Sequence, residues 1–130
     1  MTDHDDALYL AHIDEAATRI EQSASRRGRE ALGADAELRD ATLYRLQTLA
    51  ESTQRLSFGL KASYPDIPWE DIGGFRNRVV HGYLGVDLDI IWDVVRRDLP
   101  ALARMARTEL TLRGRRPPDR DLDDGLGLGP

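Results

Sequence analysis

Apolar residues recur at steps of three and four residues through the first half of the chain, and this period constrains the fold most strongly. The first segment shows it at Leu10, Ile13, Ala17 and Ile20. Such spacing predicts an amphipathic helix over Asp5 to Arg27. A second segment with the same period predicts a helix over Ala34 to Leu60. Alternating patterns typical of strands are scarce.

Glycine, proline and aspartate residues mark the expected helix boundaries. The segment Gly28–Gly33 predicts a loop between the first two helices. The run 64–68 predicts a turn, and its last residue, Pro68, suits the first position of a third helix. Asp87 predicts the N-cap of a last helix, which Pro100 is expected to kink or break.

The chain of 130 residues is long enough for one domain with a buried core. We predict an all-α fold over residues 1–113, an up-and-down bundle of four main helices. From Gly114 to Pro130 most residues are Arg, Asp, Gly or Pro, which leaves little apolar surface to bury. This composition predicts a disordered C-terminal tail.

Composition argues against several classes of protein. The chain has no cysteine, so disulfides and thiolate metal sites are impossible. No apolar run approaches the ~18 residues that a membrane span needs, so we expect no membrane contact and a cytoplasmic location.

The net charge of −5 argues against a broadly basic nucleic-acid surface. RNA binding would need a local basic patch. Its candidates are Arg26, Arg27, Arg29, Arg76, Arg78, Arg96 and Arg97.

The most informative stretch is R-N-R-V-V-H-G-Y at residues 76–83. It places Arg76, His81 and Tyr83 within about two helical turns. A guanidinium can hold a phosphate through two parallel hydrogen bonds. An imidazole can accept and donate a proton near neutral pH. These two groups are the minimum needed to cleave RNA without a metal ion.

The pattern R-N-x-x-x-H-x-Y resembles the signature of HEPN-domain ribonuclease toxins, in particular the HepT family. The flanking matches are Ile67–Ile72 upstream, then Val86, Asp87, Trp92 and Leu99–Leu102 downstream. Glu51, within A-E-S, stands where family members often carry G-E-A. The resemblance is strongest from about Pro65 to Leu102, and it implies the same helical topology.

The resemblance implies a metal-independent endoribonuclease, with no cofactor, that acts on RNA such as tRNA. His81 would act as general base toward a ribose 2′-hydroxyl or as general acid toward the leaving 5′-oxygen. Arg76 would neutralise charge in the transition state. Asn77 would hold the imidazole or a phosphate oxygen, and Glu51 would orient His81 or pair with Arg76.

The resemblance also implies two protein partners. On a straight helix Arg76 and His81 point more than about 100° apart, so arginine reach, a distortion near Gly82 or a second subunit must bring them together. HEPN toxins are similar proteins that act as homodimers, and we predict a homodimer.

HepT-like toxins are encoded beside a minimal nucleotidyltransferase antitoxin. Tyr83 is the implied target of its adenylylation, which would add negative charge beside Arg76.

Two other hypotheses account for the same residues. In the first, Arg76 forms a buried ion pair with Glu51 that locks two helices, and His81 caps a helix end. The chain would then be a structural bundle. In the second, the chain is a non-catalytic helical module that binds a nucleotidyltransferase or a nucleotide through Arg76 and His81.

Overall fold

The computed structural model describes residues 3–81 and 85–114, most of which are helical. The elements are α1 (Asp3–Ile20), η1 (Glu21–Ser25), α2 (Arg29–Ala34), α3 (Ala36–Gln54), α4 (Phe58–Ala62), α5 (Trp69–Gly73), α6 (Phe75–Val79), β1 (Val80–His81), β2 (Gly85–Val86), α7 (Leu88–Asp93), η2 (Val94–Asp98) and α8 (Leu99–Gly114). The segments η1 and η2 are single π-helical turns that extend their neighbouring α-helices.

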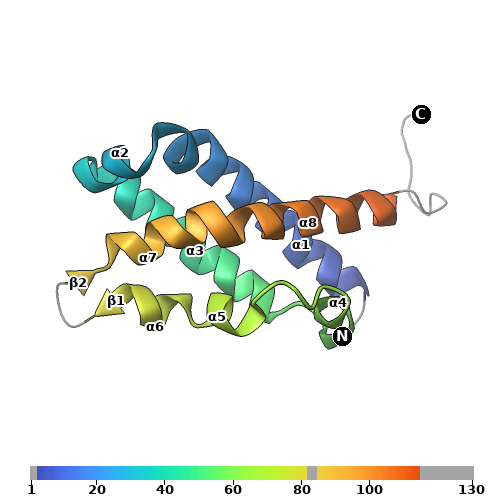
Figure 1. Ribbon diagram of the computed structural model, residues 1–130. Coiled ribbons are helices and arrows are strands. Elements are labelled where there is room, and N and C mark those ends of the chain that lie inside the picture. The colour runs from blue at the N-terminus through green and yellow to red at the C-terminus, as the bar shows by residue number, and fades with distance from the viewer. Residues whose placement is uncertain (1–2, 82–84, 115–130) are drawn as a thin grey trace, which may run out of the picture.

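Four helical segments form the bundle, and this confirms the all-α fold predicted from the sequence (Figure 1). They are α1 with η1, α3, α5 with α6, and the continuous run α7, η2 and α8. Helix α1 packs against both α3 and α8, and α5 packs against α3. Between residues 3–81 and 85–114, the only paired strands are the two-residue β1 and β2.

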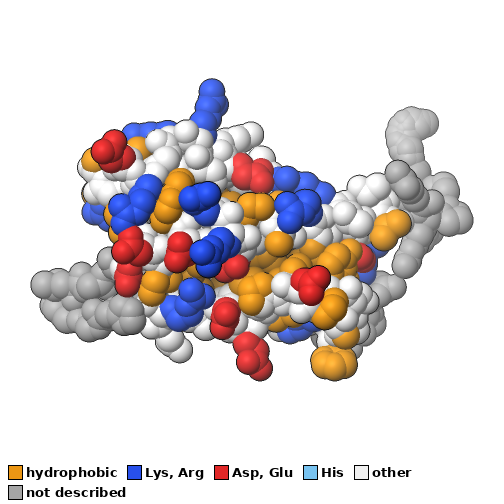
Figure 2. All heavy atoms as spheres, viewed as in Figure 1, with side chains coloured by type: hydrophobic (Ala, Val, Ile, Leu, Met, Phe, Trp, Pro, Cys, Tyr) orange, Lys and Arg blue, Asp and Glu red, His pale blue; other side chains and the backbone are white. Residues whose placement is uncertain are grey.

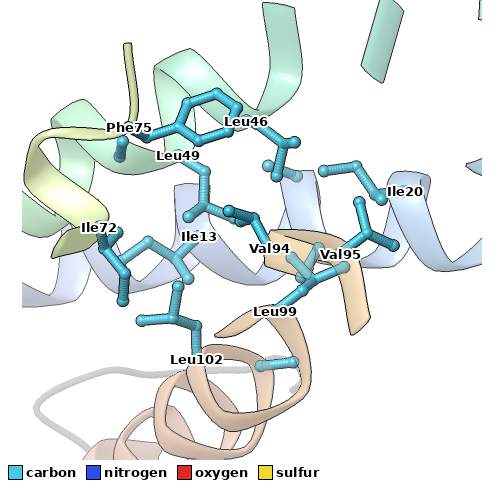
Figure 3. Packing of buried hydrophobic residues seen from close by; sticks show 14 of the residues in the cluster. Ile13, Ile20, Leu46, Leu49, Ile72, Phe75, Val94, Val95, Leu99 and Leu102 are labelled. Carbon is cyan, nitrogen blue, oxygen red and sulfur yellow. The ribbon is translucent and has the colours of Figure 1, made fainter. Parts of the chain in front are cut away.

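The bundle has a charged exterior and an aliphatic interior. Figure 2 shows acidic and basic side chains interspersed over α7 and α8. The core draws on every main segment, and Figure 3 shows its side chains pointing toward one another. Its members include Ile13, Ile20, Leu46, Leu49, Ile72, Phe75, Val94, Val95, Leu99 and Leu102. Burial of each such side chain contributes roughly 1.5–3 kcal/mol, so this cluster is the main source of stability. Within the described ranges, no helix is both long enough and apolar enough to span a bilayer.

Two of the predicted boundaries are wrong around the second helix. The segment Gly28–Gly33 is not a loop, because Gly28 alone takes a left-handed conformation (φ 95°) and α2 follows it directly. The helix predicted to reach Leu60 ends at Gln54. A new helix, α4, begins after Ser57. The Ser57 side chain accepts a hydrogen bond from the backbone N–H of Leu60 and so caps α4.

The later boundaries agree more closely with the sequence. Asp87 caps α7 as predicted, since its Oδ1 accepts hydrogen bonds from two backbone N–H groups at 3.0 and 3.2 Å. Pro68 is the N-cap of α5, one position before the predicted one. Gly114, the first residue of the predicted tail, is the last residue of α8, and residues 115–130 lie outside the described residues.

Of the two outcomes predicted at Pro100, a kink or a break, the break does not occur. Pro100 is the second residue of α8, which follows the π-helical η2 without interruption. The change from π-helical to α-helical bonding shifts the hydrogen-bond register, so a residue without an N–H can be accommodated there. The other π-helical turn, η1, contacts η2 across the bundle.

A buried carboxylate fastens the N-terminal end of α1 to α4. Asp6 is 1% exposed, and it accepts hydrogen bonds from the Ser57 backbone N–H at 2.8 Å and the Ser57 hydroxyl at 2.7 Å. Arg113 of α8 lies 3.8 Å from the same carboxylate and pairs with Glu109 at 2.7 Å. Tyr64 donates to Glu109 at 2.6 Å; burial, then this hydrogen bond, raises the pKa of Tyr64 to about 12. Together these contacts hold three chain segments at one end of the bundle.

Replacement of Asp6 by Ala is expected to lower the free energy of unfolding by about 2–4 kcal/mol, because the buried Ser57 donors lose their acceptor. The matched control is Asp40→Ala, which removes an exposed carboxylate in the second turn of α3 and is expected to change stability by less than about 0.5 kcal/mol. Urea unfolding followed by circular dichroism measures both. Equal stability of the two variants would contradict the role given to Asp6.

Candidate functional site

A break between α5 and α6 positions the motif. Helix α5 ends at Gly73 and α6 begins at Phe75. Ile72 and Phe75 are 2% and 1% exposed, so each short helix is fastened to the core by a large apolar side chain. With Phe75 turned inward, Asn77 on the same helix is exposed.

The motif is divided between a helix and a strand. Helix α6 contains Arg76 and Asn77 and ends at Val79. His81 belongs to β1 and pairs with Gly85 of β2 in an antiparallel ladder. The third helix predicted from Pro68 onward therefore does not reach His81, and the angle calculated for Arg76 and His81 on a straight helix does not apply.

The β-branched pair Val79-Val80 gives a physical reason for the early end of α6. Valine loses side-chain freedom in a helix and favours extended backbone. Tyr83 lies outside the described residues, as do the side chains of Arg76 and His81.

Glu51 and Asn77, the two predicted supporting residues, line one groove between α3 and the α5–α6 segment. The groove has a volume of about 490 Å³. Its other walls are Tyr44, Gln47, Thr48, Ala50, Gln54 and Gly73. We call this hollow the motif groove. Glu51 is exposed, which contradicts a buried ion pair at this carboxylate.

Gly73 leaves room for the side chain of Gln54 where α5 packs against α3. A Cβ atom at Gly73 would lie 1.8 Å from Nε2 of Gln54, so any larger residue would push the glutamine amide out of its place in the motif groove. Neither Gly73 nor Gln54 was predicted as a site residue. The pair Gly73-Gly74 before the motif is the sequence signal that could have indicated a close backbone approach.

The side chains that line the motif groove are mostly polar and uncharged, and they surround one carboxylate. Among the residues given as its walls, Glu51 is the sole carboxylate and none is a histidine. Across residues 3–81 and 85–114, no group of three or more His, Asp or Glu side chains is placed to hold a metal ion. The described walls therefore offer hydrogen-bonding partners rather than a metal-ligand set.

Arg78 has a positioning role in the fold. Its Nη1 donates to the backbone carbonyl of Asp71 at 3.1 Å, which links α6 to α5. Burial raises the pKa of Asp98 in η2, and the nearby charge of Arg78 opposes this shift. Arg78 therefore lies where α5, α6 and η2 meet.

The arginines predicted to form a basic patch differ in their partners. Arg27 and Arg29 each form an ion pair with an aspartate, which neutralises their charge locally. Arg26, Arg96 and Arg97 are exposed and have no hydrogen bond or ion pair with other described residues. Figure 2 shows acidic side chains among the basic ones over α7 and α8. On this face the basic residues are mixed with acidic ones.

Comparison with known proteins identifies relatives of the chain. The model of the family described as "Ribonuclease HepT-like" matches residues 13–109. "Probable ribonuclease HepT" from Thermococcus cleftensis is 30% identical over 94 residues, which cover 72% of this chain and 86% of that protein. A "Putative RNase" from Caldanaerobacter subterraneus subsp. tengcongensis is 25% identical over 99 residues, which cover 76% of this chain and 88% of that protein.

A longer relative shares the same region. A "Gamma-glutamylcyclotransferase and putative RNase" from Methanocaldococcus jannaschii is 31% identical over 95 residues, which cover 73% of this chain but 43% of that protein. No solved structure matches the chain. The family match spans every main helix and the whole motif, and on this basis the chain belongs to the HepT-like ribonuclease family.

Proposed function

We propose that the chain is the toxin of a toxin–antitoxin pair, a cytoplasmic ribonuclease that cleaves RNA such as tRNA without a metal ion. The observation that carries the proposal is the family match over residues 13–109, which includes the R-N-x-x-x-H-x-Y stretch. The position of Asn77 and Glu51 on one groove supports it, because Asn77 belongs to α6, the helix that also contains Arg76.

The proposed reaction uses the RNA's own 2′-hydroxyl as nucleophile. His81 accepts the proton of this hydroxyl, and the 2′-oxygen forms a bond to phosphorus. The bond from phosphorus to the 5′-oxygen breaks, and an imidazolium returns a proton to that oxygen. Arg76 neutralises the charge that develops on the phosphate oxygens. The products are a 2′,3′-cyclic phosphate and a free 5′-hydroxyl.

Asn77 and Glu51 are proposed to support the two catalytic groups. A carboxylate that accepts the N–H of one imidazole nitrogen leaves the other nitrogen free as a base, which is the role proposed for Glu51. The Asn77 amide, exposed two residues before the end of α6, would hold the imidazole or a phosphate oxygen. A homodimer would bring a second copy of the motif to the same cleft and so supply acid and base together.

The proposed antitoxin is a minimal nucleotidyltransferase that adenylylates Tyr83. The added phosphate would bring negative charge next to Arg76, and the adenosine would add bulk in the cleft. Both effects oppose RNA binding, because the modified tyrosine competes with the RNA phosphate for the same cation.

The first test replaces the two catalytic residues. Arg76→Ala and His81→Ala are each expected to slow RNA cleavage at least about 100-fold, because each removes a group that acts in the transition state. The matched control Arg104→Ala removes an exposed arginine of α8 and should cleave like the wild type. Cleavage of total tRNA in EDTA measures all three, and circular dichroism verifies folding. Equal cleavage by the folded catalytic variants would refute the assignment of the site.

The second test concerns the modification. After co-expression with a minimal nucleotidyltransferase encoded beside it, the intact mass of the wild type should increase by one or more adenylates. Tyr83→Phe should gain none, because it lacks the accepting hydroxyl. Tyr44→Phe is the control, since Tyr44 is 68% exposed and lines the motif groove. A mass gain that persists in Tyr83→Phe and disappears in Tyr44→Phe would move the modification to Tyr44.

A further inference from the structure

A second hollow adjoins the motif groove along α3. It lies between the N-terminal half of α1 and the C-terminal half of α3 and has a volume of about 410 Å³. Its walls include Tyr9 and His12 from α1 and Arg55 at the end of α3. Thr48 and Glu51 line both hollows, so the two adjoin at the same stretch of α3.

Arg55 faces this second hollow without a carboxylate partner in the described part of the chain. Its Nη1 donates to the Tyr9 hydroxyl at 3.4 Å, and Glu51, one turn earlier on α3, forms no ion pair with it. Arg19 and Arg107, in contrast, both pair with carboxylates. The Arg55 guanidinium therefore keeps most of its five donors available for an anion from solution.

The remaining walls of the second hollow suit a nucleotide. His12 is exposed, forms no hydrogen bond with other described residues, and adds a second group able to carry positive charge. Tyr9 packs against the core and donates no hydrogen bond to another described residue, while its hydroxyl accepts one from Arg55; the ring is thus held in place. Leu8 beside it is 64% exposed and provides an apolar edge. A fixed aromatic ring next to a guanidinium is the combination that binds a base and its phosphate.

We propose that the second hollow is a nucleotide subsite for the RNA strand that leaves the motif groove. Arg55 and His12 bind a phosphate, and Tyr9 stacks on the adjoining base. The volume lies within the range of small-molecule sites, about 300–1,000 Å³. This subsite rests on the proposed ribonuclease function, and it gives a chain with a net charge of −5 a local means of holding RNA.

The test measures binding of a 2′-O-methyl oligoribonucleotide, which resists attack by the 2′-oxygen, to the full chain by fluorescence anisotropy. Arg55→Gln is expected to raise the Kd about tenfold at low salt, because it removes a charged phosphate contact. The slope of log Kd against log salt concentration should fall by about 0.7, the value for one phosphate of a single strand. A purely structural role for Arg55 would leave this slope unchanged.

Matched variants separate the subsite from general charge effects. Arg104→Gln makes the same change of charge on the exposed face of α8 and should alter the Kd less than about twofold. Tyr9→Leu should raise the Kd about tenfold through the loss of stacking. Tyr9→Phe keeps the ring and should bind like the wild type.

The possible results test the proposed subsite independently of the proposed ribonuclease activity. If Arg55→Gln lowers affinity and salt slope but the wild type cuts no RNA, the subsite holds and the ribonuclease proposal fails. If the wild type cuts RNA and Arg55→Gln binds like Arg104→Gln, the subsite is refuted and the ribonuclease remains. If Arg55→Gln changes the oligomeric mass in light scattering without changing the salt slope, the hollow is a protein interface, which also refutes the subsite.

Discussion

The packing of α5 and α6 onto α3 is the constraint on which the candidate site depends. Buried Ile72 and Phe75 hold the two short helices on the core, and the absence of a side chain at Gly73 leaves room for the Gln54 amide. The motif groove is the space left between these elements at the surface. Its shape is therefore a consequence of apolar packing, while its polar walls determine what it can bind.

The two hollows along α3 suggest how an acidic protein can hold a polyanion. Most of the arginines discussed above are neutralised by aspartate or glutamate or serve as links between helices. Arg55 differs from these and from the exposed Arg26, Arg96 and Arg97, because it faces a hollow that adjoins the motif groove and that His12 also lines. A few cations placed along a groove can bind phosphates at short range even when the net charge is negative, because salt screens the more distant acids.

The sequence predicts the parts of this structure that depend on local pattern. The helical period places the main helices, and the cap at Asp87 needs only the aspartate and the two N–H groups that follow it. The family resemblance selects Glu51 and Asn77, and both line the motif groove. The roles of Arg76, His81 and Tyr83 remain predictions.

The features that the sequence does not predict depend on contacts between distant segments. The second helix ends early where Ser57 binds Asp6, a residue from the start of the chain. The π-helical turn before Pro100 faces another π-helical turn, and local propensity predicts neither. The motif helix stops at Val79 because the following residues pair as a short hairpin, whose register involves Gly85 and Val86.

The central claim is that RNA binds across the motif groove, between α3 and the α5–α6 segment. The most direct measurement is the change in backbone amide NMR shifts of ¹⁵N-labelled His81→Ala protein on addition of the 2′-O-methyl oligoribonucleotide. The largest changes are expected at Glu51, Gln54 and Asn77. Largest changes at Arg104 and Thr108, on the exposed face of α8, would contradict the claim.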